Sequence, residues 1–108
     1  MIDLNEAAEA SFEVLKRREA NGAVNISTKP WRMLEHMASE VMELSGAYSC
    51  YLAQHGDKVF KNALAGEIAD VVICAMCFAA QQDIDIEEAV DSKMRLNEKR
   101  AQKQGDKL

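Results

Sequence analysis

The sequence contains one proline, five glycines and few aromatic residues, which make up 6% of its 108 residues. Because proline and glycine interrupt helices, a chain with so few of them favours long helices. The shortage of aromatic residues disfavours a β-sandwich or a barrel. The N-terminal stretch is acidic and does not resemble a signal peptide. Together with three cysteines, an odd number, this indicates a reducing, cytoplasmic setting.

Positive charge is also in short supply. The 13 basic residues are outnumbered by 18 acidic residues, which gives a formal net charge of −5. This balance argues against a general nucleic-acid binder. The longest apolar stretch, 64–80, is short for a membrane span and contains two acids, so we expect no membrane partner. A chain of this length predicts one domain, 1–108.

Apolar residues recur at helical spacing in four segments. The expected helices cover about residues 3–19, 30–53, 58–82 and 85–100, and a polar tail follows at 101–108. The connections between them are short, which is typical of antiparallel neighbours. The sequence therefore predicts an all-α fold, an antiparallel four-helix bundle.

The helix boundaries are predicted from turn and capping signals. In chain order these signals are a stop at Asn21-Gly22, a polar connection at 21–28, a cap at Thr28 or Lys29 before Pro30, a tight turn at His55-Gly56-Asp57, and a capping box formed by Asp85 and Glu88.

Glu67 and Asp70 are the only charged residues in the stretch 64–80. They are three residues apart and so share one face of a helix. Glu40 and Glu43 repeat this spacing in the preceding helix. A carboxylate among apolar residues is costly unless it is paired or binds a metal. Two neighbouring helices that each present such a pair inward predict a four-carboxylate metal site.

Four oxygen donors without a matching cysteine or histidine favour a hard cation, Mg²⁺ or Mn²⁺. Mg²⁺ commonly completes its coordination with waters and substrate phosphates, so the site favours phosphate chemistry. A di-iron bundle would need a Glu-x-x-His motif, which neither pair has. The alternative is that Glu40 and Glu43 face water and pair with lysine or arginine.

A second set of residues offers contacts for a phosphate, a sugar or a base. Lys93, Asn97 and Arg100 form one stripe of hydrogen-bond donors on the last helix, although such a face is often simply solvated. His36, one turn before the first acid pair, is a candidate substrate contact or a packing residue. Trp31 is a candidate for stacking on a base or for anchoring the core.

Cys74 and Cys77 form a Cys-x-x-Cys pair in the middle of an apolar helix. A thioredoxin-type motif opens a helix after a strand, and a zinc site needs a second pair. We interpret these two residues as packing thiols.

The chain resembles the MazG-like, all-α nucleoside triphosphate pyrophosphatase superfamily over about residues 33–100. The stretches that carry the resemblance are SEVME at 39–43, GEIAD at 66–70, DIDIEEAV at 83–90 and KMRLNEKR at 93–100. The resemblance implies Mg²⁺-dependent hydrolysis of a nucleoside triphosphate to the monophosphate and pyrophosphate, in a homodimer or homotetramer.

The resemblance also implies roles for individual residues. The metal ligands would be Glu40, Glu43, Glu67 and Asp70, with Glu43 also a candidate general base, and the substrate contacts would be Lys93, Asn97 and Arg100. Many members of the superfamily have a further glutamate before each acid pair, where this chain has Ser39 and Gly66.

Two other functions remain open at this point. One is a non-catalytic MazG-like oligomer that only binds its ligand, which the missing glutamates would suit. The other is a plain helical interaction protein whose acids are solvated. The sequence does not name the base or the sugar of the nucleotide, and it leaves dimer and tetramer open.

Overall fold

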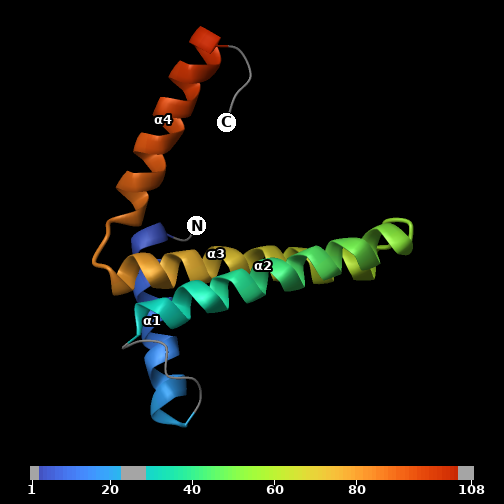
Figure 1. The fold of residues 1–108 in the computed structure, drawn as a ribbon, viewed down its shortest axis with the longest axis horizontal. Helices are drawn as coiled ribbons and strands as arrows, with labels where there is room; N and C mark the ends of the chain where they lie inside the picture. The colour runs from blue at the N-terminus through green and yellow to red at the C-terminus, as the bar shows by residue number, and fades with distance from the viewer. Residues whose placement is uncertain (1–2, 23–28, 105–108) are drawn as a thin grey trace.

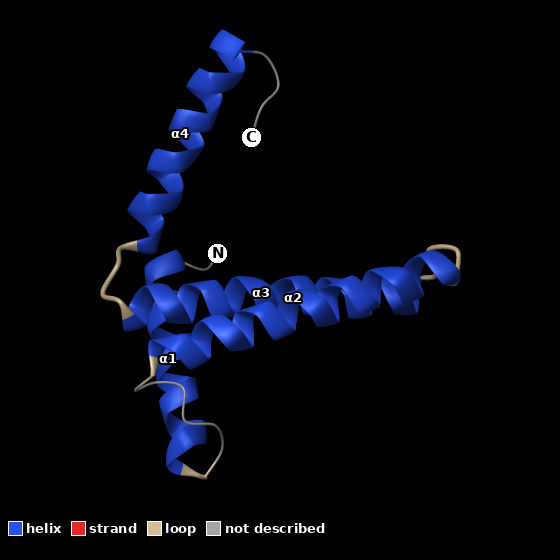
Figure 2. Cartoon of the chain, viewed as in Figure 1, coloured by secondary structure: helices blue, strands red, loops and turns tan. Residues whose placement is uncertain are grey.

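The computed structural model describes residues 3–22 and 29–104, and within these ranges the fold contains four helices and no strand. The helices are α1 (Leu4–Ala20), α2 (Pro30–Ala53), α3 (Lys58–Gln81) and α4 (Ile86–Gln104) (Figure 1, Figure 2). The all-α prediction is confirmed, and α4 continues past the predicted end near Arg100. Residues 23–28 of the expected polar connection at 21–28, and the last part of the tail, 105–108, lie outside the described residues.

Several of the predicted turn and capping signals act as expected, although Lys29 caps α2 without a side-chain hydrogen bond. Asp57 begins α3 by accepting a hydrogen bond from the backbone N–H of Val59 at 2.9 Å. Asp85 accepts one from the backbone N–H of Glu88 at 3.1 Å at the start of α4. Gly56 has a φ of +75°, a left-handed conformation that glycine adopts without strain, in the turn between α2 and α3.

The long helices α2 and α3 form an antiparallel hairpin, and α1 crosses its open end against α3 (Figure 1). We call this open end the base and the rest of the hairpin the arm. Helix α4 starts at the base and leaves in another direction, so it touches α1 and α3 but not α2. The four helices therefore do not close into an antiparallel bundle within one chain.

Asn5 of α1 fixes the start of α4. Its Oδ1 accepts hydrogen bonds from the backbone N–H groups of Ile86 at 3.1 Å and Glu87 at 3.4 Å. Its Nδ2 donates to Asp85 at 2.8 Å, and the backbone N–H of Leu4 donates to the Glu87 carboxylate at 2.9 Å. These contacts hold the N-termini of the first and last helices together at the base.

The core lies at the base, where α1 covers the hairpin. Met33 of α2 packs with Cys74 and Cys77 of α3, and all three side chains are buried. The cluster is surrounded by the partly buried residues Leu15, Met37 and Phe78. Both cysteines are free thiols, as the interpretation of packing thiols expects.

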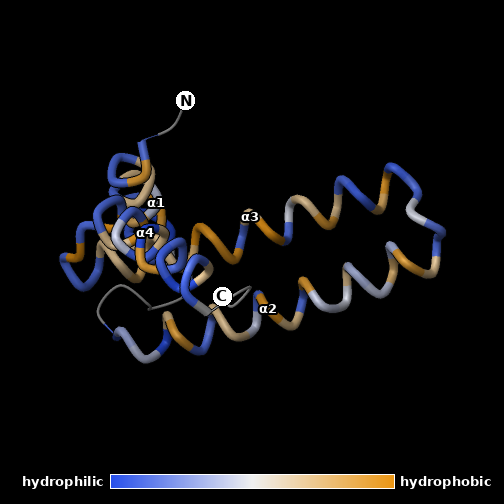
Figure 3. Tube along the Cα trace, turned by 90° about the horizontal axis from the view of Figure 1, so that it is seen from above, coloured by the Kyte–Doolittle hydropathy of each residue, from blue (hydrophilic) through white to orange (hydrophobic). Residues whose placement is uncertain are grey.

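The arm leaves much apolar surface uncovered, and hydrophobic segments continue along both of its helices (Figure 3). The accessible surface of the chain is 8053 Å², against about 6000 Å² for a compact monomer of 12.0 kDa. The radius of gyration is 16.4 Å, against about 13 Å for a compact domain of about 100 residues. One chain is therefore more extended, and exposes more surface, than a compact monomer of its size.

Several apolar residues that recur at helical spacing are more than two-fifths exposed in the single chain. On α2 and α3 they are Leu34, Val41, Tyr48, Ile68, Val72 and Ile73. A glycine inside a helix, such as Gly66, indicates either close packing or access at that point. A Cβ at Gly66 would meet nothing within 4 Å, so the single chain fits access rather than close packing.

By length and composition alone, α3 is able to cross a membrane. The stretch 64–80 is too short, but the whole helix contains 24 residues. The core helix of a soluble protein has the same properties. Glu67 and Asp70 lie near its middle, where a charged side chain costs about 2.5–3.5 kcal/mol in lipid. These charges disfavour a membrane span, and the absence of a membrane partner stays a prediction.

Candidate metal centre

The register of the hairpin determines which acids face each other. Glu40 and Asp70 are equally far in sequence from His55 in the turn, and the same holds for Glu43 and Glu67. Residues in such positions on two antiparallel helices lie at the same height along the hairpin. The register thus places both acid pairs on one section of the arm, next to the base.

Three of the four predicted metal ligands converge. One carboxylate oxygen each from Glu40, Glu67 and Asp70 lies within 4.8 Å of the other two. We call these three residues the acid group. Glu43 is exposed and, among the described residues, belongs to no such group, although it is one turn from Glu40 on α2.

Within the acid group, Glu40 lies in surroundings that disfavour its negative charge. Burial raises the pKa of Glu40, and repulsion from Glu43 and Asp70 adds to the rise, while His36 opposes it. Oε2 of Glu40 and Oε2 of Glu67 are buried and accept no hydrogen bond from the described residues. A buried acceptor without a partner is costly. These two oxygens therefore fit a cation, and the all-oxygen donor set fits Mg²⁺ or Mn²⁺.

Glu40 also belongs to a second group, with His36 of α2 and Cys74 of α3. One ligand atom from each lies within 4.8 Å of the other two. His36 Nε2 is 3.4 Å from Glu40 Oε1. Burial raises the pKa of Cys74 to about 11, and the charges of Glu40 and Asp70 act in the same direction. The thiol is therefore protonated at neutral pH while no metal is bound.

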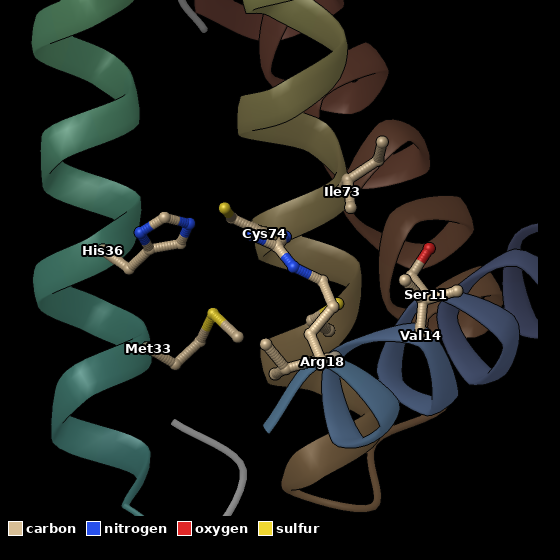
Figure 4. Close-up of a pocket in the computed structure, with 9 residues that line it drawn as sticks. Ser11, Val14, Arg18, Met33, His36, Ile73 and Cys74 are labelled. Atoms are coloured by element: carbon tan, nitrogen blue, oxygen red, sulfur yellow. The ribbon is translucent and has the colours of Figure 1, made fainter. Parts of the chain in front are cut away.

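A cavity of about 260 Å³ opens beside this second group, between α1, α2 and α3 (Figure 4). Its walls are mostly apolar and are formed by Ser11, Val14, Leu15, Arg18, Met33, His36, Ile73, Cys74 and Cys77. Ligand pockets for drug-sized molecules measure about 300–1,000 Å³, so this cavity suits one ring system rather than a whole nucleotide.

The predicted substrate stripe on α4 is not near the acid group in this chain. Lys93, Asn97 and Arg100 lie on α4, which leaves the base and does not contact α2 (Figure 1). Asn97 Oδ1 is buried and accepts no hydrogen bond within the part of the chain that the structure describes. The stripe and the acids are therefore separate features of one protomer.

The two aromatic candidates are placed differently. His36 lines the cavity and forms an ion pair with Glu40 when it is protonated. Trp31 is 76% exposed in the first turn of α2, so the interpretation of a core anchor is wrong for the single chain. Trp31 does not line the cavity.

Sequence reasoning missed Cys74 as a neighbour of the acids. The signal was present, because His36 and Cys74 are equally far from His55, as Glu40 and Asp70 are. The register thus places an imidazole and a thiol opposite each other, one turn nearer the base than Glu40 and Asp70. Because Cys74 and Cys77 were interpreted only as a Cys-x-x-Cys pair, the position of Cys74 opposite His36 was missed.

Comparisons of the chain with protein-family models, with curated proteins and with solved structures found no match.

Proposed function

We propose that this chain is a Mg²⁺-dependent nucleoside triphosphate pyrophosphohydrolase of the MazG-like type. The observation that carries the proposal is the acid group, in which Glu40, Glu67 and Asp70 bring three carboxylate oxygens within 4.8 Å of one another. Two of these residues also present a buried oxygen that lacks a hydrogen-bond donor among the described residues. The motifs quoted above supply the substrate class.

The acid group would hold the cation, and Glu43 would remain free to act on water. When bound, Mg²⁺ would screen the negative charge of the triphosphate and lower the pKa of a bound water. Glu43 is exposed and one turn from Glu40, so its carboxylate is available to accept a proton from an attacking water. We assign it the role of general base.

The cavity beside the acids is our candidate for the base of the nucleotide. Its walls are mostly apolar, and it lies next to Glu40 through His36 and Cys74. Nucleotide sites commonly combine apolar walls with a few polar groups that set orientation. His36 and Arg18 supply polar groups here, so a base in the cavity would leave its phosphates near the acid group.

The active assembly would be a homodimer or a homotetramer in which the copies share sites. One chain exposes about 2,000 Å² more than a compact monomer would, and a standard interface buries about 800 Å² per partner. Because α4 leaves the hairpin, its stripe would reach an acid group in a second copy. Lys93, Asn97 and Arg100 would then bind the phosphates or the sugar held by the partner.

The decisive experiment is a panel of ribonucleoside and deoxyribonucleoside triphosphates, incubated with Mg²⁺ and assayed for pyrophosphate release. We expect one or more to be hydrolysed, and Asp70→Asn to abolish the activity. Glu35→Gln is the matched control, because Glu35 is an exposed carboxylate on α2 outside the acid group. Full activity in Asp70→Asn would refute the assigned site.

The same panel separates the rival functions. A non-catalytic binding module would show a higher melting temperature with Mg²⁺ and nucleotide but no pyrophosphate release. A plain helical interaction protein would show neither effect.

A further inference from the structure

We propose that His36, Glu40 and Cys74 form a second metal site, for a borderline-soft divalent cation such as Zn²⁺. The three residues offer a ring nitrogen, a carboxylate oxygen and a sulfur, all within 4.8 Å of one another. Two of them come from α2 and one from α3, so a bound ion would join the two helices of the hairpin.

The distance between the nitrogen donor and the oxygen donor fits a tetrahedral ion. Zinc binds nitrogen and oxygen at about 2.0–2.2 Å, which places neighbouring N and O ligands roughly 3.4 Å apart in a tetrahedron. His36 Nε2 and Glu40 Oε1 are 3.4 Å apart. The two residues are one helical turn apart, and the Cys74 sulfur points across the hairpin toward the His36 ring (Figure 4).

The donor set selects a different cation from the acid group. Thiolate and imidazole ligands favour Zn²⁺ and other transition metals, whereas Mg²⁺ prefers oxygen alone. Three protein ligands leave the fourth tetrahedral position for water or a ligand in the cavity. On binding, the Cys74 thiol would release its proton to solvent, since the thiolate is the ligand.

Exposure provides a route for the ion. Cys74 is only 6% exposed, but the His36 side chain is 42% exposed and lies at the edge of the cavity. The second ion would take Oε1 of Glu40, which faces His36, and would leave Oε2, which accepts no hydrogen bond from the described residues, for the cation of the acid group. The inference concerns binding alone and does not rest on the proposed hydrolysis.

Titration with Co²⁺, which reports its ligands by absorption, tests the site. The titrations use Cys50→Ser as the parent, because Cys50 is an exposed thiol that would bind Co²⁺ on its own. We expect a thiolate-to-cobalt absorption band and tetrahedral visible bands in this parent. Zn²⁺ should bleach both, because it takes the same ligands.

Two variants of this parent identify the ligands. Cys74→Ser should lose the thiolate band, whereas Cys77→Ser should keep it, because Cys77 is equally buried one turn away but belongs to neither ligand group. His36→Gln should weaken Co²⁺ binding at least tenfold. Circular dichroism checks folding, and because His36 is half-exposed, its variant tests the site even if Cys74→Ser does not fold.

Three results would overturn the inference. They are a parent protein without the thiolate band, a band that persists in Cys74→Ser, and Co²⁺ affinity in His36→Gln within twofold of the parent.

Discussion

The two ends of the α2–α3 hairpin are built from similar residues but are buried to very different degrees. At the base, Met33 and Cys77 are almost fully buried beneath α1. Near the turn, Leu52 is 56% exposed and Val59 is 71% exposed on the same two helices. The difference shows that hydrophobicity alone does not bury a residue, because a third element must pack across the pair.

The acid group lies between these two ends, next to the base. The packed base holds α2 and α3 in the register that faces Glu40 toward Asp70. The exposed arm leaves that section open on the other side, where Ile68 and Val72 of α3 are nearly half exposed. Under our proposal, the packed core of one chain would position the ligands of a metal ion at this border, and a second chain would complete the site.

The prediction with the largest expected effect is that the acid group of one copy and the α4 stripe of another form one active site. We expect Asp70→Asn and Lys93→Ala each to be inactive or severely impaired alone, and a mixture to recover activity after the subunits exchange. In a mixed dimer, one site has both an intact acid group and an intact α4 stripe. The assay is pyrophosphate release after co-refolding.

Co-refolding Asp70→Asn with Glu67→Gln is the control, because two variants of the same acid group leave no intact group in any assembly. If the Asp70→Asn and Lys93→Ala mixture stays as inactive as this control, α4 does not act across the interface.

The sequence predicts the local structure well because local structure depends on neighbouring residues. The turn at His55-Gly56-Asp57 and the cap at Asp85 are short-range interactions, and they lie where the sequence signals place them. The register of the hairpin also follows from its short turn. It brings Glu40 and Asp70 together, as the spacing of the acids predicts.

The direction of α4 was not predictable from the sequence, since it depends on contacts between distant residues. Asn5 of α1 binds the first backbone N–H groups of α4, and the preceding Asp83 adopts a left-handed φ of 56°. Periodicity reports that a helix has an apolar face but not which element covers it. For the same reason the sequence does not predict that Val41 and Ile68 are nearly half exposed.

The next prediction compares the consequences of a substitution in the base with those of a substitution in the arm. We expect Met33→Ala to lower the free energy of unfolding by about 2–5 kcal/mol, because it leaves a cavity in the packed base. This decrease in the free energy of unfolding should not depend on protein concentration. We expect Leu52→Asp on the arm to raise the dissociation constant of the assembly at least tenfold, because a charge would then face the partner.

Urea denaturation and sedimentation at several protein concentrations measure both effects. Leu52→Ala serves as the milder control for the arm. A concentration-dependent cost for Met33→Ala, or a wild-type species of 12.0 kDa at micromolar concentration, would contradict the assignment of base and arm.

A smaller effect concerns the charge at the border. Burial and the charges of Glu43 and Asp70 raise the pKa of Glu40 above its ordinary value of 4.5, although His36 opposes the rise. Between its two pKa values the metal-free folded state thus binds more protons than the unfolded state. The stability that this group contributes is present below its unfolded pKa and is lost as pH rises through the folded pKa.

We therefore expect the free energy of unfolding, measured in chelator, to fall as pH rises above about 4.5, and to fall less in Glu40→Gln. Glu35→Gln should keep the wild-type slope, because Glu35 lies outside the acid group. If the free energy of unfolding falls equally steeply with pH in wild type and in Glu40→Gln, Glu40 does not cause the pH dependence.

The prediction with the smallest expected effect concerns whether a second chain packs closely against the arm. Gly46 on α2 and Gly66 on α3 are helical glycines, and a Cβ at either would meet nothing within 4 Å. Glycine inside a helix costs about 0.5–1 kcal/mol relative to alanine, so we expect Gly46→Ala and Gly66→Ala each to raise stability by about that amount. Thermal denaturation at low and high protein concentration measures the change.

If Gly66→Ala instead lowers stability only at high concentration, while Gly46→Ala raises it throughout, a second chain packs directly against Gly66. In that case, glycine in place of the superfamily's common glutamate would allow two chains to pack closely, and its role would be in assembly rather than in the reaction.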